Sequence, residues 1–278
     1  MGVKRFKPVT PARRHAELTD FEELTTDEPE ESLLEPLKKS GGRNNQGKET
    51  VRGRGGGHKK KYRKIDFQRD KEGVKGKVVS TEYDPNRSAW ITLLLYEDGE
   101  RRYIISPLKL DVGEVVEAGD GAEVRPGNAM PLRKIPAGKP IHNLEFSPGS
   151  GGKIARSAGV DARIVAKESE KIDVKLPSGE IRSFDPECKA TVGQVSNPSH
   201  KNVKSGKAGR KRHMGRKPKV RGVAKNAVDH PHGGGEGRAY IGRPPVSSSG
   251  VPAKGGKTRK AKESDEKIIK RRTKKKRG

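Results

Sequence analysis

Charge is arranged in blocks along the 278-residue chain, and this arrangement most constrains what the chain can fold into. Residues 65–200 hold 20 Lys and Arg against 21 Asp and Glu, whereas residues 201–278 hold 26 against five. Residues 38–64 hold eleven bases and one acid, and residues 17–37 hold nine acids and no base. Basic arms with little apolar content cannot offset the entropy cost of ordering, so they stay extended until a partner neutralises them. We therefore expect a folded, nearly neutral middle flanked by extended basic arms.

The total charge and the single cysteine narrow the class of protein further. A net charge of +26 and a pI near 10.1 indicate a polyanionic partner. No apolar run approaches the roughly 20 residues needed to cross a bilayer, and the first residues lack the apolar stretch of a secretory signal. Cys188 can form no intramolecular disulfide, which fits a reducing compartment, and its strand-like surroundings favour a buried thiol over a nucleophile. We expect a cytoplasmic protein with no membrane partner.

The middle of the chain has the pattern of short β-strands. A first set of runs rich in Val, Ile, Leu and aromatics covers 76–84, 88–96 and 101–106. A second set covers 139–146, 160–168, 171–176, 180–184 and 188–195. Short strands with frequent Gly and Pro favour two small barrels in series, and the prolines of 125–138 suggest a linker between them. Trp90 is expected in the barrel core, with a base-stacking platform as the alternative.

Two Gly-rich stretches resemble catalytic or metal sites. SPGSGGK (147–153) fails as a phosphate-binding loop because Ser147 replaces the first Gly and Ile154 the hydroxyl residue. It is interpreted as a backbone turn that allows close approach. In DHPHGGGEG (229–237), His230 and His232 could present both rings to one metal ion, but no compact second pair of ligands accompanies them. A flexible glycine loop and a nucleic-acid contact are the other interpretations. Glycines let the main chain approach phosphates and imidazoles can contact bases, which favours nucleic acid.

Three stretches rich in Lys and Arg flank the neutral middle: 52–64, 200–222 and 257–278. Each alone could be a solvated charged segment. Together with the loop at 229–237, they indicate an RNA or DNA partner.

A series of ordered motifs resembles the bacterial-type large-subunit ribosomal protein L-two family. They are GGRNNQGKETVRGRGGGHKKKYRKIDF (41–67), EYDPNRSA (82–89), GNAMPLRKIPAG (127–138), PGSGGKIARSAG (148–159), LPSGEIR (176–182), GKAGRKR (206–212) and VDHPHGGGEGR (228–238). The resemblance implies an OB-like barrel followed by an SH3-like barrel. It also implies a primary binder of large-subunit ribosomal RNA that supports subunit association, tRNA binding and the peptidyl-transferase region. Its implied partners are that RNA, small-subunit ribosomal RNA at the subunit interface, and neighbouring ribosomal proteins.

A direct part in peptide-bond formation is disputed within this family for the residue matching His230, and we expect no enzyme activity. The chain departs from the family pattern at His213 and Met214, at Lys225 and Ala227, and at Ser248 and Ser249. These changes remove aromatic and rigid contacts near the C-terminal tail.

The predicted fold is mostly β: two small barrels in series, OB-like then SH3-like, with long basic and largely irregular extensions. The predicted segments are an N-terminal extension 1–64 (acidic 17–37, basic 38–64), barrels at 65–126 and 127–200, and an RNA-penetrating extension 201–278. No catalytic residue, metal, cofactor or small-molecule substrate is expected. A sequence-independent DNA-packaging protein and a His-dependent metal hydrolase are the alternatives. RNA contacts are predicted from Arg43, Arg52, Arg54, His58, Lys59, Lys60, Lys61, Tyr62, Arg63, Lys64, Arg87, Lys153, Arg156, His200, Lys201, Lys207, Arg210, Lys211, Arg212, Arg216, Lys217, Arg221, His230, His232, Gly233, Gly234, Gly235 and Arg238.

Overall fold

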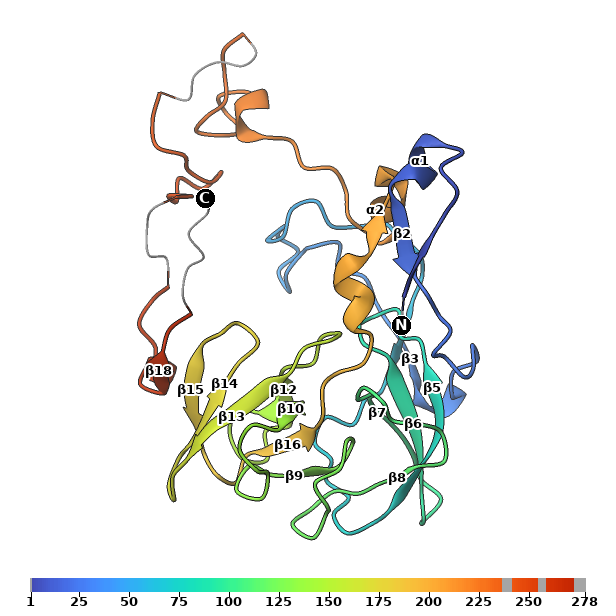
Figure 1. The fold of residues 1–278 in the computed structure, drawn as a ribbon. Helices are drawn as coiled ribbons and strands as arrows, with labels where there is room; N and C mark the ends of the chain where they lie inside the picture. Colours follow the sequence, from blue (N-terminus) through green and yellow to red (C-terminus); the bar gives the residue numbers. More distant parts are fainter. Residues whose placement is uncertain (1, 237–241, 255–258, 273–278) are drawn as a thin grey trace. The chain divides into compact units, whose positions relative to one another are not determined.

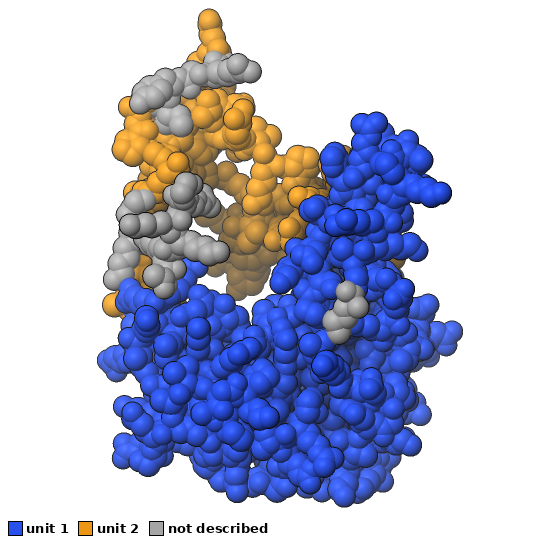
Figure 2. Space-filling model, viewed as in Figure 1, with its two compact units in different colours: residues 1–37, 59–207, 263–278 blue, residues 38–58, 208–262 orange. Residues whose placement is uncertain are grey.

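A computed structural model describes residues 2–236, 242–254 and 259–272 (Figure 1). The chain divides into two compact units (Figure 2). The first contains residues 1–37, 59–207 and 263–278, and the second contains residues 38–58 and 208–262. Strands dominate the regular structure of the described residues, and the expected mostly β fold with OB-like and SH3-like barrels is confirmed.

The first sheet of the first unit is built from the predicted runs between residues 76 and 106. Its order is β7 (Arg101–Ile105), β6 (Ile91–Tyr96), β5 (Gly76–Glu82) and β8 (Val115–Val116), with antiparallel neighbours. Val78, Leu94 and Ile104 from three of these strands are almost fully buried in one cluster. Alternation along each strand places these side chains on the inner face, which is the burial that holds the sheet together.

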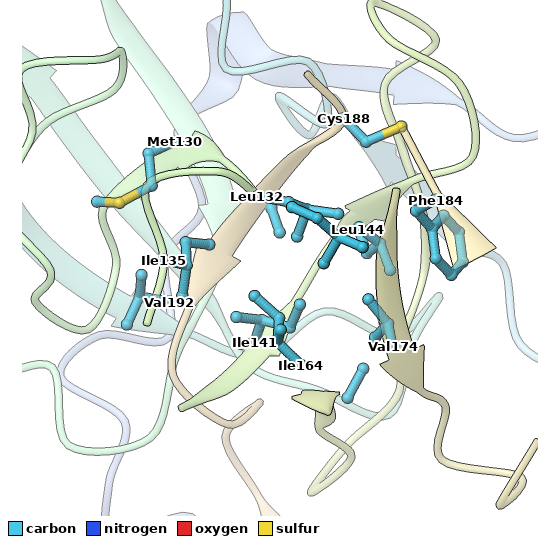
Figure 3. Close-up of a cluster of buried hydrophobic side chains, with 13 residues drawn as sticks. Met130, Leu132, Ile135, Ile141, Leu144, Ile164, Val174, Phe184, Cys188 and Val192 are labelled. Atoms are coloured by element: carbon cyan, nitrogen blue, oxygen red, sulfur yellow. The ribbon is translucent and has the colours of Figure 1, made fainter. Parts of the chain in front are cut away.

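The second sheet has seven strands and holds the largest core. Its order is β18 (Ile268–Lys270), β15 (Ile181–Phe184), β14 (Ile172–Lys175), β13 (Ala162–Lys167), β10 (Pro140–His142), β16 (Lys189–Val192) and β9 (Ala129–Pro131). A two-stranded sheet of β11 (Leu144–Glu145) and β12 (Gly152–Ile154) accompanies it. Figure 3 shows Ile141, Ile164, Val174 and their neighbours pointing into one shared interior. The five predicted runs of the second set each contain at least one of these strands.

The interpretation of residues 125–138 as a linker is wrong. Met130, Leu132 and Ile135 are 0% exposed within the core of the second sheet, and β9 pairs with β16. The prolines misled the prediction because Pro131 ends a strand at the edge of the sheet, where a missing N–H breaks no ladder.

The ends of the chain contribute short strands to the first unit. β1 (Val3–Arg5), β2 (Ala16–Thr19) and β17 (Lys204–Ser205) form a three-stranded sheet, and β3 (Leu34–Pro36) pairs with β4 (Lys61–Arg63). Near the C-terminus, β18 pairs with β15, and the Arg182 guanidinium donates to the Ser264 carbonyl at 2.6 Å. Parts of the basic extensions are therefore ordered by pairing with the folded middle. The helices are short: α1 (Pro11–Arg14) in the first unit and α2 (Ala208–His213) in the second. Single 3-10 turns cover Glu31–Leu33, Pro198–Asn202, Gly222–Ala224 and Glu263–Asp265.

Two single residues behave as the sequence predicts. Cys188 is 0% exposed, and burial raises the pKa of its thiol to about 11, so it is a structural thiol. Trp90 is buried, and its indole N–H donates to the Glu23 carboxylate at 2.9 Å. Its ring contacts Phe21 and Tyr83, so part of its cover comes from the acidic N-terminal segment.

Replacing Ile135 with Ala tests the corrected role of residues 125–138. A cavity in the core of the second sheet should cost about 2–5 kcal/mol of unfolding free energy. The matched control is Val165→Ala, because Val165 is 52% exposed on β13 and should change stability by less than about 0.5 kcal/mol. Urea unfolding of the free protein measures both. If the two substitutions lowered the free energy of unfolding equally, residues 125–138 would not be part of the core and would be a linker.

Candidate nucleic-acid interface

In the first unit, two arginines from distant motifs stack on one phenylalanine. The Arg156 guanidinium lies 4.4 Å from the Phe67 ring centroid, and the Arg87 guanidinium lies 5.5 Å from it. Both distances are within the range of cation–π attraction. The end of the 41–67 motif, the EYDPNRSA motif and the PGSGGKIARSAG motif therefore meet at one place, which we call the arginine stack (Phe67, Arg87 and Arg156).

A buried carboxylate fixes the position of Arg87. Asp84 is 0% exposed, accepts the Asn86 backbone N–H at 2.8 Å, and pairs with Arg87 Nε at 2.5 Å. This is an Asx turn, in which the side chain organises the backbone that follows it. Asn86 Nδ2 in turn donates to the Lys61 carbonyl at 2.8 Å, and the Lys60 ammonium donates to the Pro85 carbonyl. The loop is thus held against the basic arm.

Arg156 has no such carboxylate. Its guanidinium donates to the Gly152 carbonyl at 3.1 Å, and it forms no ion pair with any residue that the structure describes. Its pKa is lowered, first by partial burial and then by the nearby charge of Arg87. An arginine keeps its charge under such a shift, so Arg156 is a partly desolvated cation without a counterion. A phosphate could supply that counterion through paired hydrogen bonds.

The SPGSGGK turn is organised from within. The Glu145 carboxylate, 2% exposed, accepts the backbone N–H groups of Gly149 at 3.1 Å, Gly151 at 2.9 Å and Lys189 at 3.0 Å. Two of the amides that a phosphate loop would present are therefore already occupied. The exposed Lys153 follows the turn on β12.

In the second unit, two distant basic stretches are joined by their backbones. Gly55 N–H donates to the Gly215 carbonyl at 3.1 Å, and His58 N–H donates to the His213 carbonyl at 2.9 Å. Gly57 is essential to this approach, because a Cβ atom there would lie 2.6 Å from the Gly215 nitrogen. The glycines of the basic arm therefore serve close packing of the chain against itself.

This joining creates a cleft lined by cations. The cleft has a volume of about 420 Å³, and six side chains carry its charge: Arg54, Lys211, Arg212, Arg216, Lys217 and Lys219. No acid lines it, and none of the six forms an ion pair within the described part of the unit. We call this feature the cationic cleft. Six like charges around one cleft repel one another, and a polyanion would relieve that repulsion.

In the HPH loop (residues 229–236), each of the two histidine rings accepts a hydrogen bond from a backbone N–H group. His230 Nδ1 accepts the His232 backbone N–H at 3.0 Å, and His232 Nε2 accepts the Val246 N–H at 2.8 Å. A ring nitrogen that accepts is unprotonated, so in its neutral form His230 carries its proton on Nε2. Its pKa is lowered by partial burial and by the neighbouring His232, Lys225 and Arg52, which favours that neutral form. His230 thus presents a hydrogen-bond donor.

The glycines of this loop allow two segments of the chain itself to lie close together. A Cβ atom on Gly233 would lie 2.1 Å from the Asn226 carbonyl oxygen, and Gly234 N–H donates to the Lys225 carbonyl at 2.9 Å. No group of three or more His, Cys, Asp or Glu side chains in the described residues could hold a metal ion.

The remaining predicted contact residues fall into four groups. Exposed side chains outside the two features are Arg43, Arg52, His58, Lys59, Lys61, Lys153, His200, Lys201, Lys207 and Arg221, and Gly235 is also exposed. Tyr62 and Arg210 are half-buried, as are three residues with internal contacts. Of these three, Lys60 contacts Pro85, Arg63 Nη1 donates to the Lys61 carbonyl at 3.2 Å, and His232 contacts Val246. The exposed Lys64 pairs with Glu35 at 3.0 Å. Arg238 lies outside the described residues.

Sequence reasoning missed Phe67, Asp84 and Lys219. The Asp-Pro-Asn sequence before Arg87 was a usable signal, because Asp begins Asx turns. Nothing local marked Phe67 as the surface on which two arginines stack.

The fold, the arginine stack and the cationic cleft define an RNA-binding protein of the barrel class. Two family models match the chain. Ribosomal Proteins L2, RNA binding N-terminal domain, covers residues 30–118, and Ribosomal Proteins L2, C-terminal domain, covers residues 125–250. The chain belongs to the ribosomal protein L2 family, and it is a structural, RNA-binding protein of the large ribosomal subunit. Among the described residues, no helix has the length and apolar character that a membrane span requires.

Neutralising the cationic cleft should flatten the salt dependence of RNA binding. Replacing Arg54, Lys211, Arg216 and Lys217 with Gln removes up to four phosphate contacts, each worth about 0.7–0.9 in the slope of log affinity against log salt. The control replaces four exposed cations of the first unit, Lys4, Lys7, Arg13 and Arg14, and so removes the same charge. Fluorescence anisotropy with a large-subunit ribosomal RNA fragment measures the slopes. If both variants flatten the slope equally, only net charge matters and the cleft is not a site.

Proposed function

We propose that the chain is a primary binder of large-subunit ribosomal RNA. The observation that carries this proposal is the cationic cleft, where six cations converge without a single acid. Each phosphate that enters such a cleft releases condensed counterions, which is the main source of affinity in protein–nucleic acid binding. The barrels supply a rigid frame that fixes the register of the arms on the RNA.

The arginine stack is proposed to orient the RNA. Its two guanidinium planes are held by Phe67, and Arg87 is also held by Asp84, so little side-chain entropy is lost when a phosphate or base binds. Fixed arginine planes can pair with a phosphate or stack on an unpaired base. Lys and Arg on the flexible parts of the arms add sequence-independent attraction.

At the level of the ribosome, we propose the roles that the family resemblance implies. The chain would support subunit association, tRNA binding and the peptidyl-transferase region. It would meet small-subunit ribosomal RNA at the subunit interface and contact neighbouring ribosomal proteins, and its location would be cytoplasmic.

The two alternative functions fit the contacts less well. A DNA-packaging protein needs no rigid arginine stack, and competition between duplex DNA and folded ribosomal RNA would separate it from the favoured function. A metal ion needs the lone pair of a neutral ring nitrogen, but the lone pairs on His230 Nδ1 and His232 Nε2 each accept a backbone N–H. Elemental analysis of the purified protein tests for metal.

His230 is proposed to act as a positioned donor. A general base needs a free lone pair facing the substrate, whereas the lone pair of neutral His230 is on Nδ1 and is used by His232. The Nε2–H of neutral His230 can donate to an RNA oxygen. This arrangement stabilises a loop and an RNA contact.

Substitution of His230 should therefore leave peptide-bond formation nearly intact. His230→Gln keeps a polar group near the position of Nε2, and His230→Asn keeps an acceptor for the His232 N–H, but neither can act as a base near neutral pH. Fully assembled particles with either variant should retain the chemical step within roughly tenfold, whereas loss of a general base typically costs 10²–10⁴-fold. Single-turnover peptide-bond formation on purified particles is the measurement. A thousandfold loss in both variants, with tRNA binding intact, would make His230 a catalytic group.

A further inference from the structure

The acidic N-terminal segment lies across the first sheet and is fastened to it at several points. We call residues 20–36 the acidic strap. Thr25 N–H donates to the Thr81 carbonyl at 3.0 Å, and Thr25 Oγ1 accepts the Thr81 N–H at 2.9 Å. Further along, Glu30 N–H donates to the Tyr103 hydroxyl at 2.7 Å, and Leu33 packs against the cluster that contains Tyr103. The strap is therefore part of the folded first unit.

A groove runs between the acidic strap and strand β5. It has a volume of about 840 Å³, with an apolar floor and an acidic rim. Its lining includes three apolar residues, Val79, Leu93 and Val112, which we call the floor, and three acids of the strap, Glu28, Glu30 and Glu31, which we call the rim. No Lys or Arg lines the groove, although the chain carries a net charge of +26. We call this feature the acidic groove.

The floor of the acidic groove leaves apolar surface exposed to solvent. Val79 is 43% exposed and Val112 is 52% exposed, whereas Leu93 between them is buried. Covering two exposed valines removes apolar surface from water, which favours a partner with apolar side chains of its own.

The rim supplies negative charge that the protein does not neutralise. Glu30 pairs with Arg101, but Glu28 and Glu31 are exposed and form no ion pair within the described residues. Glu82, at the base of the groove, already accepts hydrogen bonds from Ser80 at 2.8 Å and from Tyr103 at 2.6 Å. The attraction for a partner therefore comes from Glu28 and Glu31. These charges repel phosphates and attract Lys or Arg.

We propose that the acidic groove docks an extended, basic segment of a neighbouring protein. Apolar side chains of that segment lie on Val79 and Val112, and its flanking Lys or Arg side chains pair with Glu28 and Glu31. A groove of this volume accommodates a few side chains of an extended peptide and not a folded domain. The acidic strap thus gives the protein a protein-binding groove whose lining shares no residue with the cationic cleft.

Peptide binding to the full-length free protein tests this proposal without any assumption about the ribosome. The probes are the fluorescein-labelled peptide Lys-Val-Arg-Val-Lys and its apolar-free counterpart Lys-Ser-Arg-Ser-Lys. The first should bind at least roughly tenfold more tightly, because two valines cover apolar floor. Exchanging both Glu28 and Glu31 for Lys should weaken binding at least roughly tenfold. The matched control exchanges Glu22 and Asp27, exposed acids of the same strap outside the groove lining, and should change affinity by less than about threefold.

Equal affinity for the two peptides, or equal effects of the two charge exchanges, would overturn the proposal.

A second experiment tests the groove in the assembled particle. Cys188 is buried, so Val112→Cys introduces an accessible thiol for a photocrosslinker, with Val165→Cys on β13 as control. A crosslink from residue 112 to a Lys- and Arg-rich protein segment supports docking. Crosslinking to RNA, or no crosslink beyond the control, contradicts it.

Discussion

Uncompensated positive charge is the constraint on which the second unit depends. The cationic cleft gathers six cations, and backbone hydrogen bonds between residues 53–58 and 213–217 oppose their repulsion. Those bonds require the two chain segments to lie in van der Waals contact, which explains why glycine occupies position 57. In water, repulsion among the six cations costs a modest amount of free energy per charge. Binding of phosphates in the cleft removes that cost. The second unit is therefore built for the bound state.

The first unit handles charge in the opposite way. Several of its cations pair with acids: Arg87 with Asp84, Arg102 with Asp66, and Arg101 with Glu30. Arg156 is the exception at the arginine stack, and it is held by a ring and a carbonyl in place of an acid. A cation paired with an acid stabilises the local structure but contributes little long-range electrostatic field. An unpaired cation attracts polyanions. Cations that the chain pairs internally therefore stabilise the fold, and cations that it leaves unpaired are available to bind a polyanion.

The sequence predicted most of the strands of the two barrels, because alternation of apolar and polar residues is a local property. It failed where a structure depends on distant pairing. Residues 125–138 were taken for a linker because their prolines were visible and the edge position of β9 was not. The strand β18 gains its partner β15 across more than eighty residues, so no local pattern marked it. Of the site, the cations themselves were predictable from composition. Which of them converge was not, since Arg54 and Arg216 meet only through the fold.

The acids near the N-terminus divide in the same way as the cations: some pair within the fold and others are left unpaired. Carboxylates of the acidic strap that contact the first unit, such as Glu23 with Trp90 and Glu30 with Arg101, contribute to holding the strap in place. Other strap acids are exposed, and two of these, Glu28 and Glu31, line the acidic groove beside exposed valines. Folded RNA repels such a surface, whereas Lys and Arg side chains of a protein are attracted to it. The unpaired acids of the acidic groove therefore select a protein partner over RNA, while the cationic cleft, which no acid lines, attracts a polyanion.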